Sequence, residues 1–377
     1  MIKRTLLLCF GMVVGGCLLI GQPLVWHPLA SPHYKYNSSG DLSFKMESSF
    51  FFINNEFFGD IVEGYTLPGF VAEPAVIYHV GDNFRFRAGA SFQQLYGDNE
   101  KLKVKPILSA TIGLFQNFQL TMGAIEGNLH HSLPDALFHY ERSLTQPVEN
   151  GFQLMYNSSQ LQGRAWMNWE QFIRKGDTIP EIFTSGVVLR KPLLSPDSKW
   201  SLNIPFNALV MHRGGQISDF DEEGISLLNL STGVDLKRKY DGYVKSVGLY
   251  GHYFLYKDLK DANPLGLNKG NALYTGMIME SEQSMLMLGY WRADNFLSSR
   301  GNPIYHSVSD YLPGRVFDKR EMINGSLLWY KDVHEGVVFS FLFEGFYDIA
   351  GGNLDYSYSF RIAFSPEFLI TRLGERR

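Results

Sequence analysis

The sequence has 377 residues, of which 19% are charged and 15% are aromatic, and its formal net charge is −4. A chain with this charge and no broad basic surface is not expected to bind nucleic acid. Both cysteines, Cys9 and Cys17, lie near the N-terminus, so the rest of the chain has no thiol for a disulfide framework, a thiolate zinc site or a cysteine nucleophile.

Residues 1–21 are predicted to be a secretory signal peptide. Two basic residues precede an apolar run from Leu6 to Ile20, which is the layout of an export signal, and the run is short for a membrane-spanning helix. Cleavage after Gly21 and cleavage after Ala30 both stay open. Lipid attachment at Cys17 is a third alternative, because the preceding residues resemble a lipoprotein box.

Alternating apolar and polar residues predict β-strands along most of the remaining chain. Between Phe84 and Phe92, for example, every second residue is apolar, and Arg85 and Arg87 lie on the opposite face, as expected for a strand whose side chains alternate. The same pattern predicts about sixteen strands. Their centres lie near Phe44, Val76, Ala88, Ala110, Thr121, Leu154, Ala165, Val187, Ile204, Thr232, Leu249, Gly276, Leu288, Leu327, Phe341 and Phe360.

Short and long connections alternate between these strands in chain order. This pattern is typical of a transmembrane antiparallel up-and-down β-barrel, in which short periplasmic turns lie at one end and long extracellular loops at the other. Many strands have about ten residues, the length that a tilted membrane-crossing strand needs. A soluble propeller is disfavoured because no blade-length repeat is present, and a soluble sandwich because the polar faces carry few charges. We assign residues 22–40 to a short N-terminal lead, 41–371 to the barrel and 372–377 to a polar C-terminal tail.

The mature chain as a whole resembles a Gram-negative outer-membrane β-barrel of porin-like size. The resemblance implies export to the outer membrane, contact with outer-membrane lipid and passage of small polar solutes, and it leaves a homotrimer open. One departure concerns the C-terminus, since such barrels usually end on an aromatic residue, whereas here Phe368 is followed by a polar tail.

The alternation also assigns the two faces of the barrel wall. If lipid lies outside, the large apolar residues face it, and these include Phe84, Phe86, Trp200, Phe206, Phe339, Phe341, Phe343, Tyr358, Phe360 and Phe364. The charged residues of the opposite face would then line the pore, and these include Lys45, Glu47, Arg85, Arg87, Arg164, Glu170, Asp235, Glu344 and Arg361.

The loop 126–150 is the longest of the early connections. By resemblance to general porins, whose third long loop folds inward, we expect it to narrow the barrel. Its acidic residues Asp135, Glu141 and Glu149 would then face Arg85, Arg87 or Arg164 across the opening. An ordinary surface loop is the alternative.

The expected function is an outer-membrane channel for passive diffusion of small polar solutes through a water-filled barrel. A closed barrel for export, assembly or adhesion is the alternative, since a plugged lumen gives the same strand pattern. No nucleophile motif is present, so an outer-membrane enzyme is a less favoured alternative and the protein is not expected to be an enzyme. No cofactor or metal is expected, because the adjacent His130 and His131 seldom converge on one ion with His139, and Asp219–Gly224 lacks the pattern of a calcium loop.

Overall fold

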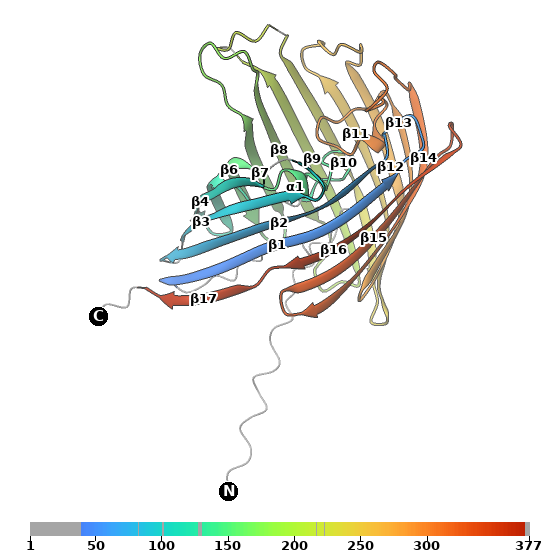
Figure 1. Ribbon diagram of the computed structural model, residues 1–377. Coiled ribbons are helices and arrows are strands. Elements are labelled where there is room, and N and C mark those ends of the chain that lie inside the picture. The colour runs from blue at the N-terminus through green and yellow to red at the C-terminus, as the bar shows by residue number, and fades with distance from the viewer. Residues whose placement is uncertain are drawn as a thin grey trace.

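The computed structural model describes residues 39–373, apart from 82, 100–101, 127–129, 216 and 222. The predicted signal peptide, Cys17, nearly all of the predicted lead and the last four residues of the predicted tail lie outside this range. Within it, one antiparallel sheet of seventeen strands forms a barrel (Figure 1). The strands are β1 (Asp41–Glu56), β2 (Tyr65–Val80), β3 (Phe84–Leu95), β4 (Lys103–Phe115), β5 (Phe118–Ala124), β6 (Asn150–Asn157), β7 (Gln162–Gln171), β8 (Glu181–Pro192), β9 (Trp200–Gly214), β10 (Ile225–Lys239), β11 (Val244–Asp258), β12 (Lys269–Ser281), β13 (Ser284–Asp294), β14 (Lys319–His334), β15 (Val337–Asp348), β16 (Asn353–Phe364) and β17 (Glu367–Arg372).

The first strand closes the barrel by pairing on both of its edges. One edge pairs with β2, and the other pairs with β16 along Ser48–Glu56 and with β17 along Asp41–Lys45. Strand β17 therefore continues β16 after a break, and the wall has sixteen strand positions. Pairing of β1 with β2 on one edge and with β16 and β17 on the other closes the sheet, which is the condition for a sheet that crosses a membrane, although among the described strands β17 pairs with β1 alone. The predicted fold class, an antiparallel up-and-down barrel of about sixteen strands, is confirmed.

Short turns and long loops lie at opposite ends of the barrel, as predicted. The short turns include 81–83, 116–117 and 282–283, and the longest loops are 125–149 and 295–318. The short turns contain residues with positive φ, such as Gly81 at 62° and Asn117 at 65°, because a tight reversal places a residue in the left-handed region that glycine and asparagine tolerate. The first strand begins and the last strand ends at the short-turn end (Figure 1).

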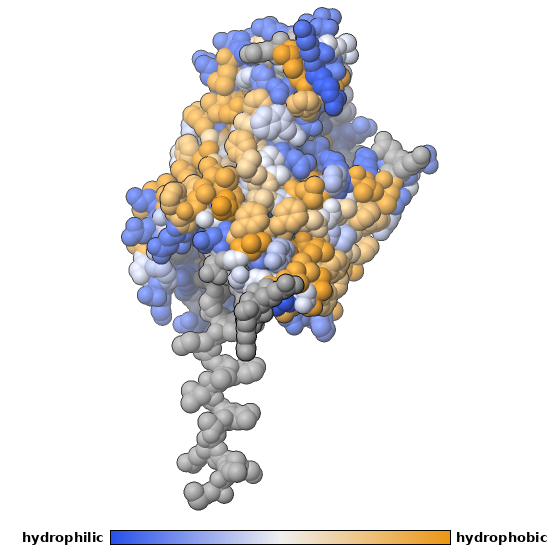
Figure 2. Space-filling model, turned by 90° about the vertical axis from the view of Figure 1, so that its left-hand side faces the viewer, coloured by the Kyte–Doolittle hydropathy of each residue, from blue (hydrophilic) through white to orange (hydrophobic). Residues whose placement is uncertain are grey.

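Large apolar side chains cover the outside of the wall. Figure 2 shows hydrophobic residues gathered across the middle of the visible face, with hydrophilic residues toward both ends. The predicted lipid-facing residues lie on the outward parity of their strands: Phe84, Phe86, Trp200, Phe206, Phe343, Phe360 and Phe364 are exposed, and Phe339, Phe341 and Tyr358 are half-buried. No helix of the described residues is long and apolar enough to cross a membrane.

An aromatic cluster occupies part of the lumen. Trp291 of β13 is fully buried, and its ring centroid lies 5.3 Å from that of Phe254 on β11 and 5.0 Å from that of Tyr305 in the loop 295–318. This loop and the loop 125–149 supply further buried side chains to the same cluster, including Phe296, Ile304, Leu133 and Leu137. Side chains therefore fill much of this region, which the prediction of a water-filled barrel did not anticipate.

Candidate active site

The two longest loops fold into the barrel and bind one another. The backbone N–H of Asn302 donates to the carbonyl oxygen of Asp135 at 2.8 Å, and its side-chain amide donates to the Asp135 carboxylate at 2.7 Å. The N–H of His139 donates to the carbonyl oxygen of Arg300 at 2.7 Å. These bonds fix 135–141, which runs into the short helix α1 (Arg142–Thr145), against the 3₁₀ turn η2 (Pro303–Tyr305). The other short 3₁₀ element, η1 (His130–Ser132), precedes this segment.

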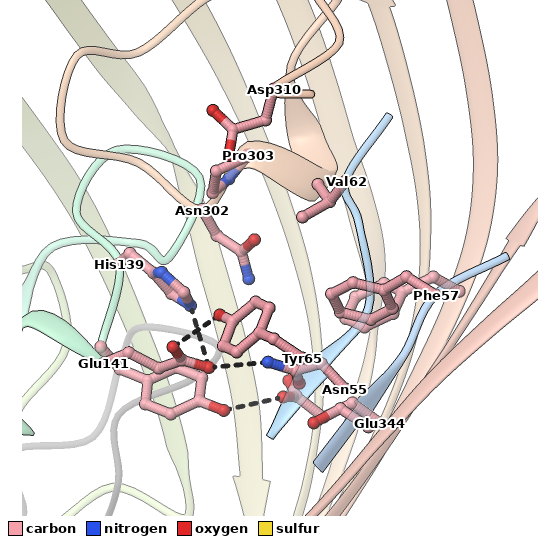
Figure 3. A pocket seen from close by; sticks show the side chains of 13 residues that line it. Asn55, Phe57, Val62, Tyr65, His139, Glu141, Asn302, Pro303, Asp310 and Glu344 are labelled. Carbon is pink, nitrogen blue, oxygen red and sulfur yellow. Dashed lines mark hydrogen bonds and ion pairs between the residues drawn. The ribbon is translucent and has the colours of Figure 1, made fainter. Parts of the chain in front are cut away.

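A small cavity of about 80 Å³ lies where these loops meet the ends of β1, β2, β15 and β16 (Figure 3). Its polar lining includes Asn55, Tyr65, His139, Glu141 and Glu344. Asn55 and Tyr65 are partners in the register of β1 and β2, on either side of the loop 57–64. Strand pairing therefore brings these two side chains together before either loop folds over them.

The carboxylate of Glu141 is the centre of the cavity's polar contacts. Its Oε2 accepts a hydrogen bond from the Tyr65 hydroxyl at 2.6 Å, and its Oε1 accepts one from the Asn55 amide at 3.1 Å. The Nε2 of His139 lies 3.8 Å from the same Oε1. Glu141 is 6% exposed, so these donors replace the water that a carboxylate needs. Figure 3 shows the three side chains converging on it.

Two further acidic residues surround this centre. The Tyr140 hydroxyl lies 3.5 Å from the Glu344 carboxylate, and the Tyr140 N–H donates to Asp135 at 3.0 Å. Burial raises the pKa of the Asp135 carboxyl above its ordinary value, and burial together with nearby carboxylates raises the pKa of the Tyr140 hydroxyl. The tyrosine therefore stays a neutral hydrogen-bond donor.

The predicted pore-lining residues lie on the inner face, where several form ion pairs. Lys45 lies 2.7 Å from Glu47, and Arg87 lies 3.2 Å from Glu47 and 3.5 Å from Glu73, so one network joins β1, β2 and β3. Their role in lining a pore stays a prediction.

The remaining predicted pore-lining residues also have polar neighbours inside the barrel. The Arg300 guanidinium donates to the two carboxylate oxygens of Glu170 at 2.9 and 3.0 Å, and this ion pair connects the loop 295–318 to β7. The other pairs are Arg85 with Glu126, Arg164 with Glu126 and Glu149, Asp235 with His252 at 2.8 Å, Glu344 with Tyr140, and Arg361 with Ser49.

The acidic residues of the loop 126–150 do not all face the arginines that we predicted. Glu149 lies near Arg164 and contacts His131 at 2.5 Å. Asp135 and Glu141 instead bind Asn302 and the ends of β1 and β2. Asn302 of the inserted loop 295–318 donates to Asp135, whereas Asn55 of β1 and Tyr65 of β2 donate to Glu141, which lines the cavity. A constriction made by this loop stays a prediction.

Acid is expected to loosen the inserted loops through His306. Burial, together with the charges of Arg320 and His139, lowers the pKa of His306 to about 3 from 6.5. Its neutral form thus stabilises the fold fully above pH 6.5, and this stabilisation is lost as the pH falls toward 3, with a slope of at most about 1.4 kcal/mol per pH unit for one proton. Chemical denaturation at graded pH should show a steeper loss of stability for the wild type than for His306→Asn. If the stability of the two proteins fell equally steeply with pH, His306 would not be the source of the acid sensitivity.

The sequence showed only part of the cavity. The sequence indicates Glu141 as a constriction residue and His139 as one of three loop histidines, but it does not single out Asn55 or Tyr65. Asn55 and Tyr65 flank the first long loop, and this position is the feature of the sequence that could have indicated that their side chains meet. Among the described residues, no group of three or more His, Cys, Asp or Glu side chains is placed to hold a metal ion.

The fold is similar to that of solved outer-membrane proteins. OprD from Pseudomonas aeruginosa is 10% identical with a TM-score of 0.51, and the match covers 88% of this chain and 95% of that one. OccK2 from Pseudomonas aeruginosa is 9% identical with a TM-score of 0.51, covering 88% and 100%. A loop-deletion mutant of OmpT, an outer membrane protein of Vibrio cholerae, is 9% identical with a TM-score of 0.51, covering 87% and 100%. These likenesses concern the fold, and the chain is a porin-like outer-membrane β-barrel.

The expectation that the protein is not an enzyme is wrong. No curated protein matches the chain, but a sequence model of an enzyme family, described as Lipid A 3'-O-deacylase-type, matches residues 34–373. The match includes the whole barrel and both inserted loops, so the residues around Glu141 lie within it. Nucleophile motifs are local in sequence, whereas these residues come from separate strands and loops. The chain therefore belongs to the Lipid A 3'-O-deacylase-type family.

Proposed function

We propose that this barrel hydrolyses an acyl ester of a lipid A-type glycolipid and that the cavity around Glu141 is its active site. The observation that carries the proposal is the sharing of one buried carboxylate by His139, Tyr65 and Asn55. A histidine beside a carboxylate is the usual arrangement for a general base, because the carboxylate orients the ring and stabilises its cationic form. The family description supports the choice of an acyl ester as substrate.

In the proposed reaction, a water molecule is the nucleophile. The imidazole of His139 accepts a proton, through the ring nitrogen that does not face Glu141, as the water oxygen bonds to the acyl carbonyl carbon. The bond between that carbon and the sugar oxygen then breaks, and the imidazolium returns the proton to the leaving oxygen. The products are a free fatty acid and a sugar hydroxyl. A cavity of about 80 Å³ has room for water, whose share of liquid volume is about 30 Å³.

Tyr65 and Asn55 are proposed to position the reacting groups. Both donate to Glu141 in the structure, and a hydroxyl or amide donor at this place is of the type that stabilises an oxyanion during acyl transfer. The apolar side chains of Phe57, Val62 and Phe346 lie beside these polar groups, so the cavity offers contacts to an acyl chain as well as to the ester. The cavity lies at the long-loop end of the wall, and outer-leaflet lipids would approach the barrel at this end.

The test is to incubate the folded barrel with purified lipid A and to follow the lipid by mass spectrometry. We expect the loss of one acyl chain and the appearance of the matching free fatty acid. An unchanged lipid, after incubation with protein whose barrel is intact by circular dichroism, would contradict the proposal. The variants that assign the activity to the cavity are treated in the Discussion.

A second candidate function is passive diffusion of small polar solutes, with the loop 126–150 narrowing the barrel. It is favoured by the polar inner surface formed by Lys45, Glu47, Glu73 and Arg87 and by the position of the loop inside the wall. Opposed charges at a narrow point order water and restrict polar solutes by size.

Removal of the inserted loop is expected to raise conductance if solutes pass beside it. In planar bilayers, deletion of Ser132–Thr145 should increase the single-channel conductance severalfold, because this segment contributes Leu133, Leu137 and Leu144 to the packed interior. The wild type in the same membrane is the reference. Bilayers that stay silent with both proteins would exclude this candidate and leave the hydrolase proposal unaffected.

A further inference from the structure

A groove of about 470 Å³ lies on the outer surface of the wall, and it shares no lining residue with the cavity. Residues of β10, β11 and β12 line it, together with Asp294 and Asn295 at the end of β13. Leu228, Leu230 and Leu255 provide an apolar surface. The side chains of Leu255 and Lys257 have the same outward parity on β11, and both are exposed. The groove therefore faces the surroundings of the barrel, whereas the proposed active site lies inside it.

Two lysines stand together at one end of this groove. Lys257 on β11 and Lys269 on β12 are direct partners in the strand register, and both line the groove. Like charges placed directly opposite each other on neighbouring strands destabilise a sheet. Among the described residues, neither lysine has an ion-pair partner within 4.0 Å, in contrast to the outward Lys319, whose Nζ lies 3.1 Å from the Glu321 carboxylate. The lysine pair thus leaves two positive charges available to an external anion.

The position of Lys257 and Lys269 relative to the membrane indicates which kind of anion they could bind. Both lysines lie next to the long loop 259–268, and so at the extracellular end of the wall. Leu228 is the register partner of Lys257, whereas Leu230 and Leu255, which are partners of each other, lie two residues further toward the middle of the barrel. Acyl chains would contact the leucines, and a phosphate at the headgroup level would contact the lysines. Asn271 and Asn295 beside them present the donors and acceptors that sugar hydroxyls need. The Asp294 carboxylate is also in the groove, 3.9 Å from Arg292.

We propose that this groove binds a phosphorylated glycolipid of the outer leaflet, with its phosphate between Lys257 and Lys269 and its acyl chains on Leu228, Leu230 and Leu255. The site is separate from the cavity around Glu141. It therefore holds a lipid against the wall whether or not that cavity hydrolyses an ester.

The test uses the full barrel in detergent with the His139→Gln substitution, so that no lipid is consumed. Binding of diphosphorylated lipid A is measured by native mass spectrometry and by titration, beside the same lipid without phosphate. We expect the double variant Lys257→Gln/Lys269→Gln to bind the phosphorylated lipid at least about tenfold more weakly, since each basic side chain near an anionic membrane surface contributes substantially to attraction. Lys257→Arg/Lys269→Arg should retain binding.

Lys319→Gln is the matched control, because this lysine is outward and at the same end of the wall but is already paired. It should leave binding unchanged. Equal binding by wild type and the double glutamine variant, or equal binding of the two lipids, would overturn the proposal. If the double variant does not fold, Lys269→Gln alone serves, with a smaller expected loss. Binding that depends on the lysines, together with a wild-type barrel that releases no fatty acid from lipid A, would reject the proposed function and retain the groove.

Discussion

Replacement of His139 by glutamine is expected to slow ester hydrolysis by about 10²- to 10⁴-fold, the usual contribution of a general base. Glutamine keeps a polar group near Glu141 but cannot accept and return the proton. Glu141→Gln should also reduce the rate, because the Tyr65 hydroxyl and the Asn55 amide would lose the carboxylate that they bind at 2.6 and 3.1 Å. The measurement is the initial rate of fatty-acid release from lipid A by the folded proteins.

His334→Gln is the control for this prediction, because His334 lies exposed near the short turn between β14 and β15, at the opposite end of the barrel. It should hydrolyse lipid A at the wild-type rate. Tyr65→Phe adds a second comparison, since it removes one hydroxyl and leaves the ring in place. A His139→Gln protein that keeps its full activity would place the reaction elsewhere in the barrel.

Phe206→Arg is expected to destabilise the barrel in lipid by about 2–4 kcal/mol, the cost of a charge on the lipid face near the middle of the bilayer. Phe206 points outward, is 40% exposed and lies near the centre of β9. The measurement is the free energy of unfolding by denaturant in lipid vesicles, followed by tryptophan fluorescence.

Tyr243→Arg is the matched aromatic replacement. Tyr243 lies in the short turn before β11 and is 77% exposed, so the new charge would remain at the interface, where its cost is only about 0–1 kcal/mol. Similar losses for the two variants would show that the outward side chains of β9 do not meet hydrocarbon.

The wall of the barrel could be predicted because its signal is local. In β16 the outward Tyr358 and Phe360 alternate with the buried Ser357 and Ser359, and the same two-residue period shows in nearly every strand. The break between β16 and β17 was not predicted, since the pairing of Phe44 with Phe368 depends on closure of the whole sheet.

The interior was predicted less well because its contacts join distant parts of the chain. Asp135 and Asn302 are 167 positions apart, and neither loop carries a periodic pattern that indicates insertion. The packing of Phe254, Trp291 and Tyr305 inside the barrel was not predicted either. Aromatic residues are also common on the outer face, so the sequence pattern does not distinguish an inward aromatic side chain from an outward one. The proposed active site could not be assembled from the sequence either, because Asn55, Tyr65 and Glu141 belong to no short motif.

The double pairing of β1 sets the order in which the barrel forms. Ser43 and Glu367 are hydrogen-bonded across 324 positions of the chain, so the seam between the first and last strands cannot form until almost all of the polypeptide has been exported. Contacts of such long range are slow to form. Until then the backbone groups at the free edge of β1 have no hydrogen-bond partners, which is costly in hydrocarbon. An exposed strand edge can also pair with other chains. A chain that stopped before residue 367 would leave Asp41–Lys45 without this partner strand.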